Sequence, residues 1–366
     1  MSPGTDTGRT VTGPDAGTGA AQEREAEMNT NGGRPASAVL RELVNGYQVS
    51  QAIHVAATLG IADLLRDGPR SSDELAAEAG AHPAALYRLL RALATVGVFR
   101  EDDGRRFALT PIGDCLRSDA PEPLGGWAAY AGRPSYWQAW GGLLDSVRTG
   151  ENAFRRVHGV SVWEHRAANP EEGASFDRAM TDGSRRVTRA VLEAYDFGRF
   201  GTVVDVGGGQ GALLAALLAA YPTMRGLLYE LPHVVARADQ VLRQAGVADR
   251  CEVVGGSFFD AVPTGGDAYL LKSVLQDWDD DGSATILRSC RRAVPATGRL
   301  LVIEQEILPP NQGRAAKFSD LNMLVSPGGQ NRTLEEYRTL LAAAGFRLLT
   351  ATPTSTGSQI IEAEPA

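Results

Sequence analysis

The chain is poor in the features that mark secreted, nucleic-acid-binding and membrane-spanning proteins. Its three cysteines, Cys115, Cys251 and Cys290, are too far apart for a metal motif and form no even disulfide set. Positive charge is also scarce, since 36 Lys and Arg stand against 44 Asp and Glu, a formal net charge of −8. No apolar run reaches the length of a membrane span, and the N-terminus has no apolar signal core. These absences favour a cytoplasmic protein that binds neither nucleic acid nor an anionic membrane.

What the chain does contain divides it into four segments. Hydrophobic residues make up 43% of the 366 positions, enough for two domains. Residues 1–34 are rich in Gly, Thr, Ala and Glu without a hydrophobic period, which predicts a disordered leader. Residues 35–120 have the pattern of a winged helix, and residues 121–200 form a helical linker whose aromatic side chains contribute to a substrate pocket. Residues 201–366 alternate strands with helices.

The winged-helix pattern occupies residues 35–120. In chain order, the pattern predicts helical structure over 39–53, a helix over 55–65 and a helix over 73–79 capped by Ser71 or Ser72. A helix opened by His82-Pro83 follows and ends near Gly97, and a hairpin then turns at residues 101–104. A winged helix can bind DNA, with Arg88 and Arg91 on its second helix. The acidic balance of the chain favours a packing role instead.

The most informative stretch runs from Val203 to Gly211, Val-Val-Asp-Val-Gly-Gly-Gly-Gln-Gly. An apolar run ends in three glycines with a fourth two positions on, and an apolar helical pattern follows. This order predicts a buried strand, a tight turn and a helix N-terminus, where glycine lets the backbone approach a nucleotide-like ligand. The next predicted strand ends on Glu230, 23 positions after Gly207, near the spacing of a ribose-binding acid.

Asp205, two residues before the first glycine, indicates which nucleotide-like ligand binds. An acid at this position suits a ligand with a positive end and no phosphate. S-adenosylmethionine (SAM) has an amino group and a sulfonium, so SAM is the predicted cofactor. Further strands, which predict a doubly wound sheet that ends in an antiparallel pair, are expected over residues 251–254, 268–271, 299–303, 346–351 and 359–363.

Several downstream motifs make a family resemblance specific. They are Leu-Pro-His-Val at 231–234, Gly-Gly-Ser-Phe-Phe at 255–259, Leu-Lys-Ser-Val-Leu-Gln-Asp-Trp-Asp-Asp at 271–280 and Gly-Gly-Gln-Asn-Arg-Thr at 328–333. With the glycine motif and the winged helix, they make the chain resemble SAM-dependent O-methyltransferases of the plant phenylpropanoid and bacterial antibiotic-tailoring type. The resemblance runs from about Ala36 to the C-terminus.

The resemblance implies an architecture, an activity and a partner. The expected fold is α/β, with a Rossmann-like doubly wound SAM-binding domain and an N-terminal all-α winged-helix dimerisation domain. The expected reaction is methyl transfer to a phenolic hydroxyl of an aromatic or polyketide natural product. The expected assembly is a homodimer whose intertwined N-terminal helices complete the partner's substrate pocket.

The resemblance also assigns roles to individual positions. The residues expected to hold the cofactor are Asp205, Gly207, Gly209, Glu230, Leu231, Ser257, Phe258, Lys272, Ser273 and Trp278. The residues expected to line the acceptor site are Trp137, Phe176, Met180, Asn322 and Met323. The soft thioethers of the two methionines suit a flat aromatic acceptor, and plain core filling is the alternative. Ser257 stands where relatives often carry Asp.

The chain departs from the resemblance at the catalytic position. A His that takes the phenol proton in plant relatives is replaced by Gln276. Of the two glutamates that orient this His, one matches Glu304 and the other position holds Asn331. Glutamine is not a general base at neutral pH, but its amide can orient a hydroxyl. The predicted catalytic group is therefore Gln276, Asp277 and Glu304.

Three explanations for the missing base stay open. The favoured one is transfer by proximity and desolvation to an aligned acceptor. Another is a substitute base, for which Asp277, His158 and His165 are candidates. The third is a non-methylating reaction on the same fold, such as hydroxylation, decarboxylation or cyclisation. Outside the enzymes, a winged-helix regulator that senses a small molecule is the rival.

The acidic run at Asp277 and Asp279–Asp281 resembles a metal cluster at first sight. It lies between a strand and a helix expected over residues 284–293. Acids at a helix start cap its free amides and complement its dipole. We therefore predict a helix cap here and no metal site.

Overall fold

The computed structural model describes residue 1 and residues 34–366, so the predicted leader over 1–34 lies outside the described residues except at its two ends. The chain separates into a unit that ends at Val49 and a unit that begins at Ser50. The first unit contains helix α2 (Ala36–Val44), which buries none of its residues, and the start of α3 (Gly46–Thr58). Its exposed apolar side chains are Leu40, Leu43, Val44 and Tyr47.

A winged helix opens the second unit. After α3 its elements are α4 (Ile61–Leu64), β1 (Arg70–Ser71), α5 (Ser72–Ala79), α6 (Pro83–Thr95), β2 (Phe99–Asp102), β3 (Arg106–Leu109) and α7 (Pro111–Asp114). The strands form a small sheet in the order β1-β3-β2, so three short strands accompany the helices. Ser71 caps α5 in a reciprocal capping box with Glu74, and Gly80 ends this helix in the left-handed region, as predicted.

The helix predicted over residues 55–65 is wrong as a single element. The structure ends α3 at Thr58 and starts α4 at Ile61, with Gly60 between them at φ 66°. A left-handed residue cannot continue a right-handed helix, and glycine adopts this conformation at little cost. The apolar spacing alone did not reveal the break, because both short helices bury the same kind of face.

Six helices connect the winged helix to the large sheet. They are α8 (Gly125–Ala131), α9 (Pro134–Gly141), α10 (Leu143–Thr149), α11 (Ala153–His158), α12 (Val162–Ala168) and α13 (Pro170–Ala194). Aromatic residues hold this segment together: Tyr130, Tyr136 and Phe154 are buried, and Phe176 packs against the Tyr130 ring. The aromatic density therefore builds a core, with several rings left half-buried at its edge.

The remaining elements form the doubly wound sheet. They are β4 (Thr202–Val206), α14 (Ala212–Ala220), β5 (Arg225–Glu230), α15 (Pro232–Val235), α16 (Ala238–Gln244), η1 (Ala248–Arg250), β6 (Cys251–Gly255), β7 (Ala268–Lys272), η2 (Leu275–Asp277), α17 (Asp280–Ala293), β8 (Arg299–Gln305), α18 (Arg314–Val325), α19 (Leu334–Ala343), β9 (Phe346–Pro353) and β10 (Ser358–Pro365). The strand order is β6-β5-β4-β7-β8-β10-β9. β10 runs antiparallel to both of its neighbours, β8 and β9, which confirms the predicted final pair, and the other neighbouring strands are parallel.

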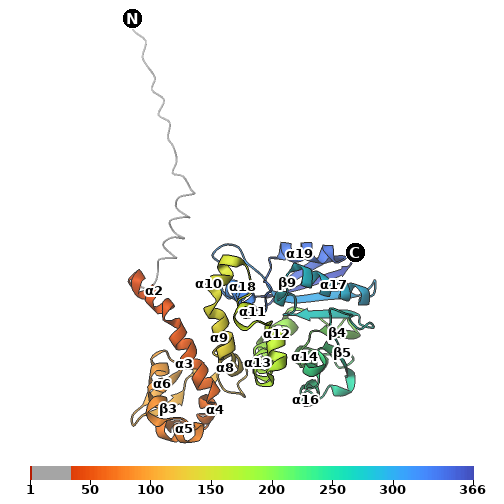
Figure 1. Ribbon diagram of the computed structural model, residues 1–366. Helices are drawn as coiled ribbons and strands as arrows, with labels where there is room; N and C mark the ends of the chain where they lie inside the picture. The colour runs from red at the N-terminus through yellow and green to blue at the C-terminus, as the bar shows by residue number, and fades with distance from the viewer. Residues whose placement is uncertain (2–33) are drawn as a thin grey trace. The chain divides into compact units, whose positions relative to one another are not determined.

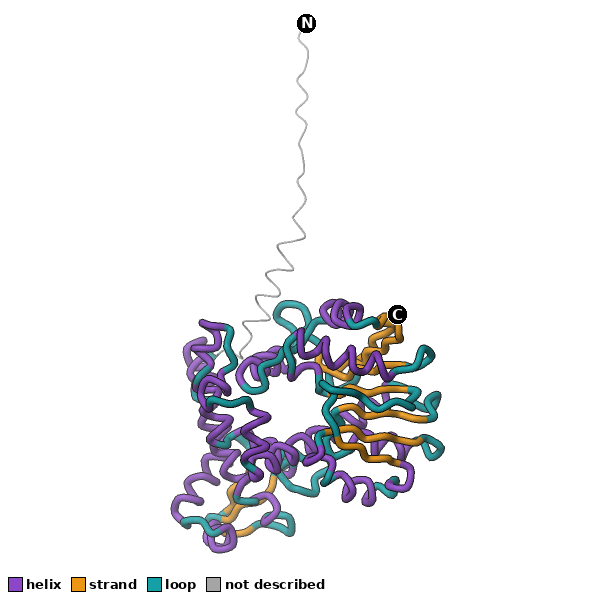
Figure 2. Tube along the Cα trace, turned by 45° about the vertical axis from the view of Figure 1, so that its right-hand side comes forward, coloured by secondary structure: helices purple, strands orange, loops and turns teal. Residues whose placement is uncertain are grey.

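Helices cover both faces of this sheet (Figures 1 and 2). Val203 faces the core that includes α14 and α16, whereas the next residue, Val204, faces the core that includes α17 and α19. Strand residues alternate between faces, so a strand buried on both sides is apolar throughout. The strand order reverses between β4 and β7, and ligands bind at the carboxyl ends of the strands at such a reversal.

In the described part of the chain, no helix combines the length and the apolar character that a membrane span requires.

Candidate active site

The glycine turn follows β4 at the reversal of strand order. Gly207, Gly209 and Gly211 have φ values of 72°, 60° and 83°, which side-chain-bearing residues rarely adopt. Space is short as well, because a Cβ at Gly207 would lie 2.8 Å from Val274 Cγ2, and one at Gly208 would lie 2.6 Å from Asp205 Cγ. The turn therefore needs glycine both for its conformation and for its close approach to neighbours.

Two carboxylates flank this turn. Asp205 is 1% exposed and neither of its oxygens has a hydrogen-bond partner among the described residues. Burial raises the pKa of Asp205 to about 7, while nearby Lys272 opposes the rise. Glu230 accepts hydrogen bonds from Leu231 N at 2.7 Å and Gly209 N at 3.2 Å, and burial raises its pKa too. The orphaned oxygens of Asp205 fit the positively charged end of SAM, and the Glu230 carboxylate, which retains lone pairs beyond its two backbone bonds, fits the ribose hydroxyls.

Other residues predicted to hold the cofactor gather around the same turn. The Phe258 ring edge would be 3.3 Å from a Cβ at Gly207, and Phe258 also packs edge-on against Trp278. Ser257 Oγ accepts a hydrogen bond from Phe259 N. Leu231 follows β5 and is exposed. The group thus combines two carboxylates with aromatic faces and exposed apolar surface.

The end of β7 contributes a cation and an unusual backbone. Lys272 Nζ donates a hydrogen bond to Ser184 Oγ on α13 at 3.2 Å, and desolvation lowers the pKa of Lys272. Ser273 has φ 56°, one of three residues other than glycine with positive φ in the described part of the chain. Such strained backbone persists where surrounding contacts over-determine it.

The loop after Ser273 is held from one side by Glu304. This glutamate is 2% exposed, and its Oε1 accepts hydrogen bonds from Val274 N and Leu275 N at 2.9 Å and from Gln276 N at 3.4 Å. Burial and the charge of Asp277 raise the pKa of Glu304 to about 8. The structure therefore brings Glu304 to Gln276, but its hydrogen bonds are to the backbone of the loop and not to the Gln276 side chain.

Arg332 holds the same loop from the other side. It is 1% exposed and donates to Leu275 O and Trp278 O, both at 3.0 Å, and to Asp280 at 2.8 Å. Arg332 lies in the motif at 328–333, whose sequence does not indicate these contacts. The neighbouring Gly329 also touches the loop, since a Cβ there would lie 2.2 Å from Gln276 O. Contacts from two distant parts of the chain, Glu304 on one side and the segment of Gly329 and Arg332 on the other, therefore determine the position of Gln276.

The side chains at the predicted catalytic position differ in their surroundings. Gln276 is half-buried, and the structure gives its amide no hydrogen-bond partner within residues 34–366. Burial raises the pKa of Asp277 to about 7, against the opposing charges of Arg166 and Lys272. Asn331 Nδ2 donates to Ala316 O on α18 at 3.1 Å. Asn331 thus anchors α18.

The residues predicted for the acceptor site come from three helices. Trp137 on α9 is half-buried, and Phe176 and Met180 lie one turn apart on α13. Asn322 on α18 accepts a hydrogen bond from the buried Tyr136 hydroxyl. The two methionines differ, because Met180 is 39% exposed and Met323 only 6%. A core role therefore suits Met323 better than it suits Met180.

The other candidate bases and the acidic run have structural partners. His158 Nε2 lies 2.9 Å from Ser135 O, and the rings of His158 and His165 both pack against Phe154. Asp279 caps α17 by accepting from Gly282 N at 2.8 Å, which confirms the predicted cap. Among residues 34–366 there is no group of three or more His, Cys, Asp or Glu placed to hold a metal ion.

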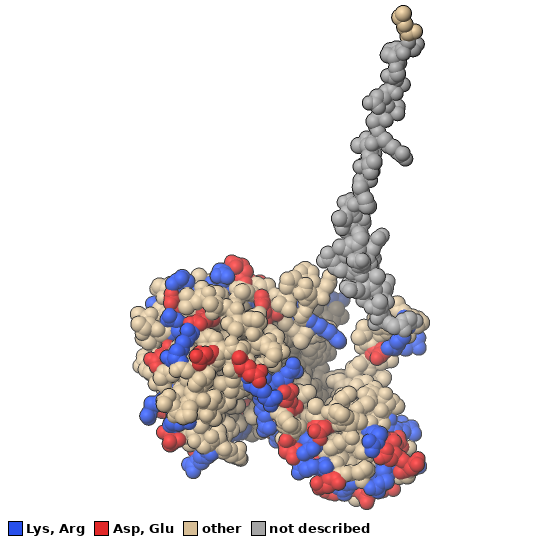
Figure 3. Space-filling model, turned by 180° about the vertical axis from the view of Figure 1, so that it is seen from behind, with Lys and Arg blue, Asp and Glu red and all other residues tan. Residues whose placement is uncertain are grey.

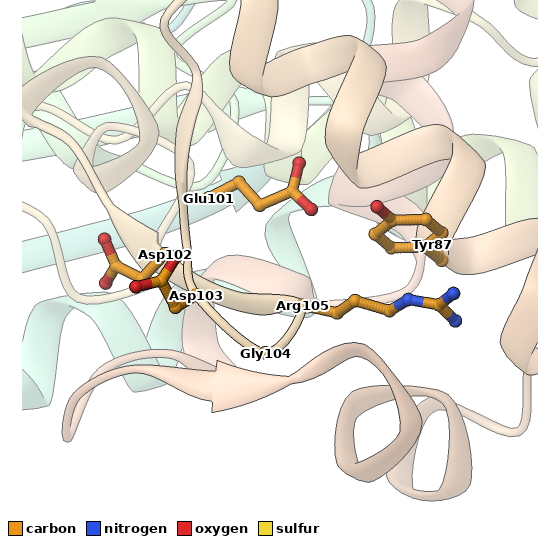
Figure 4. A pocket seen from close by; sticks show the side chains of 6 residues that line it. All are labelled: Tyr87, Glu101, Asp102, Asp103, Gly104 and Arg105. Carbon is orange, nitrogen blue, oxygen red and sulfur yellow. The ribbon is translucent and has the colours of Figure 1, made fainter.

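A surface hollow lies far from this site in sequence, at the wing between β2 and β3 (Figure 4). Glu101, Asp102 and Asp103 line it, and the Arg105 guanidinium lies 4.6 Å from the centre of the Tyr87 ring. A wing that meets DNA approaches phosphates, which three adjacent carboxylates repel. The hollow therefore has the wrong charge for a phosphate backbone.

Comparison with known proteins settles the family. The O-methyltransferase domain family matches residues 140–347, and the O-methyltransferase dimerisation domain family matches residues 41–119. The chain belongs to the O-methyltransferase family. It is accordingly a SAM-dependent methyltransferase by family, with the α/β fold and the N-terminal dimerisation domain that the sequence predicted.

Individual relatives show how far the likeness extends. A phenazine O-methyltransferase of Lysobacter antibioticus is 44% identical over 93% of this chain and 99% of its own. The crystal structure of an O-methyltransferase from neocarzinostatin biosynthesis, with S-adenosyl-L-homocysteine and 1,4-dihydroxy-2-naphthoic acid, has a TM-score of 0.74 at 37% identity, over 87% of this chain and 96% of that chain. An aclacinomycin 10-hydroxylase of Streptomyces purpurascens is 38% identical over 85% of this chain and 84% of its own.

Proposed function

We propose that this methyltransferase methylates a phenolic oxygen of an aromatic natural product, and that it aligns the acceptor without a histidine base at the Gln276 position. The observation that carries the proposal is the loop of Gln276, which Glu304 and Arg332 hold rigidly while the Gln276 amide stays free to bond an acceptor. Relatives that act on phenazine and naphthoate rings support an aromatic acceptor.

The residues around the glycine turn are proposed to hold SAM. Glu230 would accept the ribose hydroxyls, the buried Asp205 would face the positively charged end, and Phe258 would flank the adenine. When bound, SAM supplies an electrophilic methyl group on a sulfonium. Gly207 and Gly209 leave room for the ligand, because neither presents a Cβ.

The acceptor side is proposed to work by alignment and exclusion of water. The Gln276 amide would donate to or accept from the acceptor hydroxyl, and the rigid loop would keep that hydroxyl in line with the methyl group. A well-aligned pair of reactants gains several kcal/mol, roughly 7–11 kcal/mol at the upper limit, relative to free encounter. Asp277, with a pKa raised to about 7, is the proposed group for taking up the phenol proton where the acceptor does not ionise by itself.

Gln276→Ala tests the alignment role. If Gln276 only positions the acceptor, turnover should fall by less than the roughly hundredfold loss that marks a removed acid–base group. Single-turnover rates against pH, measured for wild type, Gln276→Ala and Asp277→Asn, separate the two residues. Asp277→Asn should remove a rate increase near neutral pH, because a carboxylate base acts only above its pKa. Complete loss of turnover in Gln276→Ala contradicts the alignment role.

A non-methylating reaction is the second candidate function. It is favoured by one observation, that a relative of the same length is named a hydroxylase. Mass spectrometry of products distinguishes the two, since methylation adds a methyl group derived from labelled SAM and hydroxylation adds an oxygen. A product that contains no label, made while SAM binds, assigns the chain to the second function.

A regulator that binds DNA is less well supported. On the face of the molecule in Figure 3, basic and acidic side chains are interspersed, and the wing carries Glu101, Asp102 and Asp103. Non-specific DNA binding depends on clustered Lys and Arg. A mobility-shift assay at moderate salt should therefore show no shift.

We also propose that residues 35–120 form the dimerisation domain of a homodimer, that residues 121–200 connect it to the acceptor site, and that residues 201–366 form the SAM-binding domain. Helix α2 supports this, because Leu40, Leu43 and Val44 are more than 60% exposed in the single chain. Apolar stripes of this kind cover each other across an interface. Leu43→Glu with Val44→Glu should convert a dimer to a monomer in light scattering, whereas Arg41→Glu with Glu42→Arg on the same helix should not. A dimer that persists in the first variant refutes the proposal.

A further inference from the structure

Arg166 on α12 is a half-buried cation enclosed by aromatic rings. Its guanidinium carbon lies 3.4 Å from the centre of the Phe176 ring, 4.8 Å from that of Trp163 and 5.6 Å from that of Tyr130. Guanidinium groups stack favourably on such rings, and the attraction grows as water is removed. The rings hold the charge in place and leave its edge to hydrogen-bond.

This guanidinium has few polar partners. One terminal nitrogen donates to the Tyr130 hydroxyl at 2.7 Å, and its Nε is buried without a hydrogen-bond partner. Among residues 34–366 no carboxylate forms an ion pair with Arg166, although nearby Arg133 is paired with Glu172 at 2.7 Å. A partly desolvated cation without a direct ion pair is costly, and an incoming anion that pairs with it reduces that cost.

Arg166 lies among the residues assigned to the acceptor and to catalysis. Phe176, which it covers, is one helical turn from Met180 on α13. Trp163, its other neighbour, stacks on Trp278 with ring centres 6.0 Å apart. The charge of Arg166 also reaches Asp277 of the catalytic loop, where it opposes the rise in pKa that burial causes.

We propose that Arg166 is a specificity-determining residue that binds a negatively charged oxygen of the acceptor, either a ring carboxylate or the phenolate that receives the methyl group. The proposal rests on the proposed function, since it needs an aromatic acceptor between α12, α13 and the loop of Gln276. For the phenolate, the phenol proton leaves to water, and the guanidinium stabilises the remaining charge on oxygen. The same contact then offsets the absence of a His base.

A matched pair of ligands tests whether Arg166 binds a ring carboxylate of the acceptor. 1-Hydroxy-2-naphthoic acid and 1-naphthol share a ring and a phenol and differ by one carboxylate. Calorimetric titration with S-adenosyl-L-homocysteine present should show that Arg166→Gln weakens the acid by about tenfold or more and the naphthol by much less, since only the acid loses a charge-assisted bond. Arg166→Lys, which keeps the charge, should retain part of the preference. Arg155→Gln, an exposed arginine on α11, should change neither affinity.

A coloured phenol tests whether Arg166 stabilises the phenolate form of the acceptor. 4-Nitro-1-naphthol absorbs differently as phenol and phenolate, so its ionisation can be read directly while it is bound. In wild type its titration midpoint should lie about one pH unit below the midpoint in Arg166→Gln, because an adjacent cation favours the anion. The readout belongs to the ligand, so titration of Asp277, Glu304 or Lys272 near the loop does not imitate it.

The outcomes distinguish a ring carboxylate from a phenolate as the anion that Arg166 binds. They also distinguish failure of the role of Arg166 from failure of the proposed function. A lost preference for the acid with an unchanged midpoint assigns the carboxylate, and the reverse assigns the phenolate. Unchanged affinities and an unchanged midpoint in a folded Arg166→Gln overturn the role of Arg166. If S-adenosyl-L-homocysteine binds but neither naphthalene ligand does, the proposed aromatic acceptor is refuted. If S-adenosyl-L-homocysteine does not bind, the proposed cofactor site is refuted instead.

Discussion

The glycine turn after β4 and the loop after β7 lie at the ends of neighbouring strands but are built in opposite ways. The turn takes its shape from its own residues, with positive φ at Gly207, Gly209 and Gly211. The loop takes its shape from residues far along the chain, since Glu304 binds its amides and Arg332 binds its carbonyls. One is locally encoded, and the other is assembled by the fold.

Their unsatisfied groups differ in the same way. Beside the turn, both oxygens of Asp205 lack partners among the described residues, so ligand-binding capacity remains there. In the loop the backbone is almost saturated, and the polar groups without a hydrogen-bond partner among the described residues are side chains, the Gln276 amide and the Asp277 carboxylate. The glycine turn therefore indicates a cofactor site that is completed only by its ligand. The loop of Gln276 indicates an acceptor site that is rigid before any ligand binds.

Gly329→Ala should displace the rigid loop of Gln276 and should have the largest effect on turnover. Its Cβ would lie 2.2 Å from Gln276 O and 2.3 Å from Trp278 N, so the loop has to move. A displacement of this size misaligns the acceptor, and turnover should fall by about a hundredfold. Steady-state kinetics measure the loss, and calorimetry should show an almost unchanged affinity for S-adenosyl-L-homocysteine.

Gly183→Ala on α13 is the matched control. Nothing lies within 4 Å of its added Cβ, and alanine favours a helix, so stability should rise by up to about 1 kcal/mol with turnover unchanged. If Gly329→Ala turns over as fast as wild type, the loop is not the rigid element described above.

Glu230→Ala should weaken cofactor binding at the glycine turn and leave the loop of Gln276 unchanged. It removes an acceptor for ribose hydroxyls and releases Gly209 N and Leu231 N. Affinity for S-adenosyl-L-homocysteine should fall by roughly 1–3 kcal/mol in calorimetric titration. Glu252→Ala, an exposed acid on the neighbouring strand β6, should leave it unchanged. Equal affinities in wild type and Glu230→Ala would sink the assignment of Glu230.

Glu304→Gln should sharpen the comparison with the smallest effect on turnover, and its signature is the pH dependence of stability. A carboxyl whose pKa rises to about 8 on folding binds its proton more tightly in the folded state. Its contribution to stability is therefore present at low pH and decreases as the pH rises from its ordinary value near 4.5 toward 8, by at most about 1.4 kcal/mol per pH unit.

The glutamine keeps an oxygen for the amides of Val274 and Leu275 and cannot titrate. Denaturant unfolding between pH 5 and 8 should accordingly show a shallower decline in the free energy of unfolding than in wild type. Glu335→Gln, on the exposed side of α19, should follow the wild-type curve. Parallel curves for Glu304→Gln and wild type would mean that Glu304 is ionised throughout this range.

The large sheet was predictable because its central strands, such as β4 and β7, are apolar on both faces and are bounded by turn residues. The glycine motif and Glu230 were predictable for a related reason, since their spacing is local. The helix predicted over 55–65 failed at Gly60, because both sides of the break carry the same apolar spacing. The roles of Arg332 and Arg166 were missed, because an arginine in a polar motif gives no sign of the carbonyls or rings it meets.

The sequence by itself determined the fold class, the family and the cofactor, because apolar periodicity, glycine spacing and motif order are properties of neighbours along the chain. Only the tertiary structure decided what surrounds Gln276. The contacts to its loop come from Glu304 on β8 and from Gly329 and Arg332 before α19, and the acceptor side gains Arg166 from α12. These groups meet because parallel strands bring their carboxyl ends to one edge, and no local pattern records that meeting.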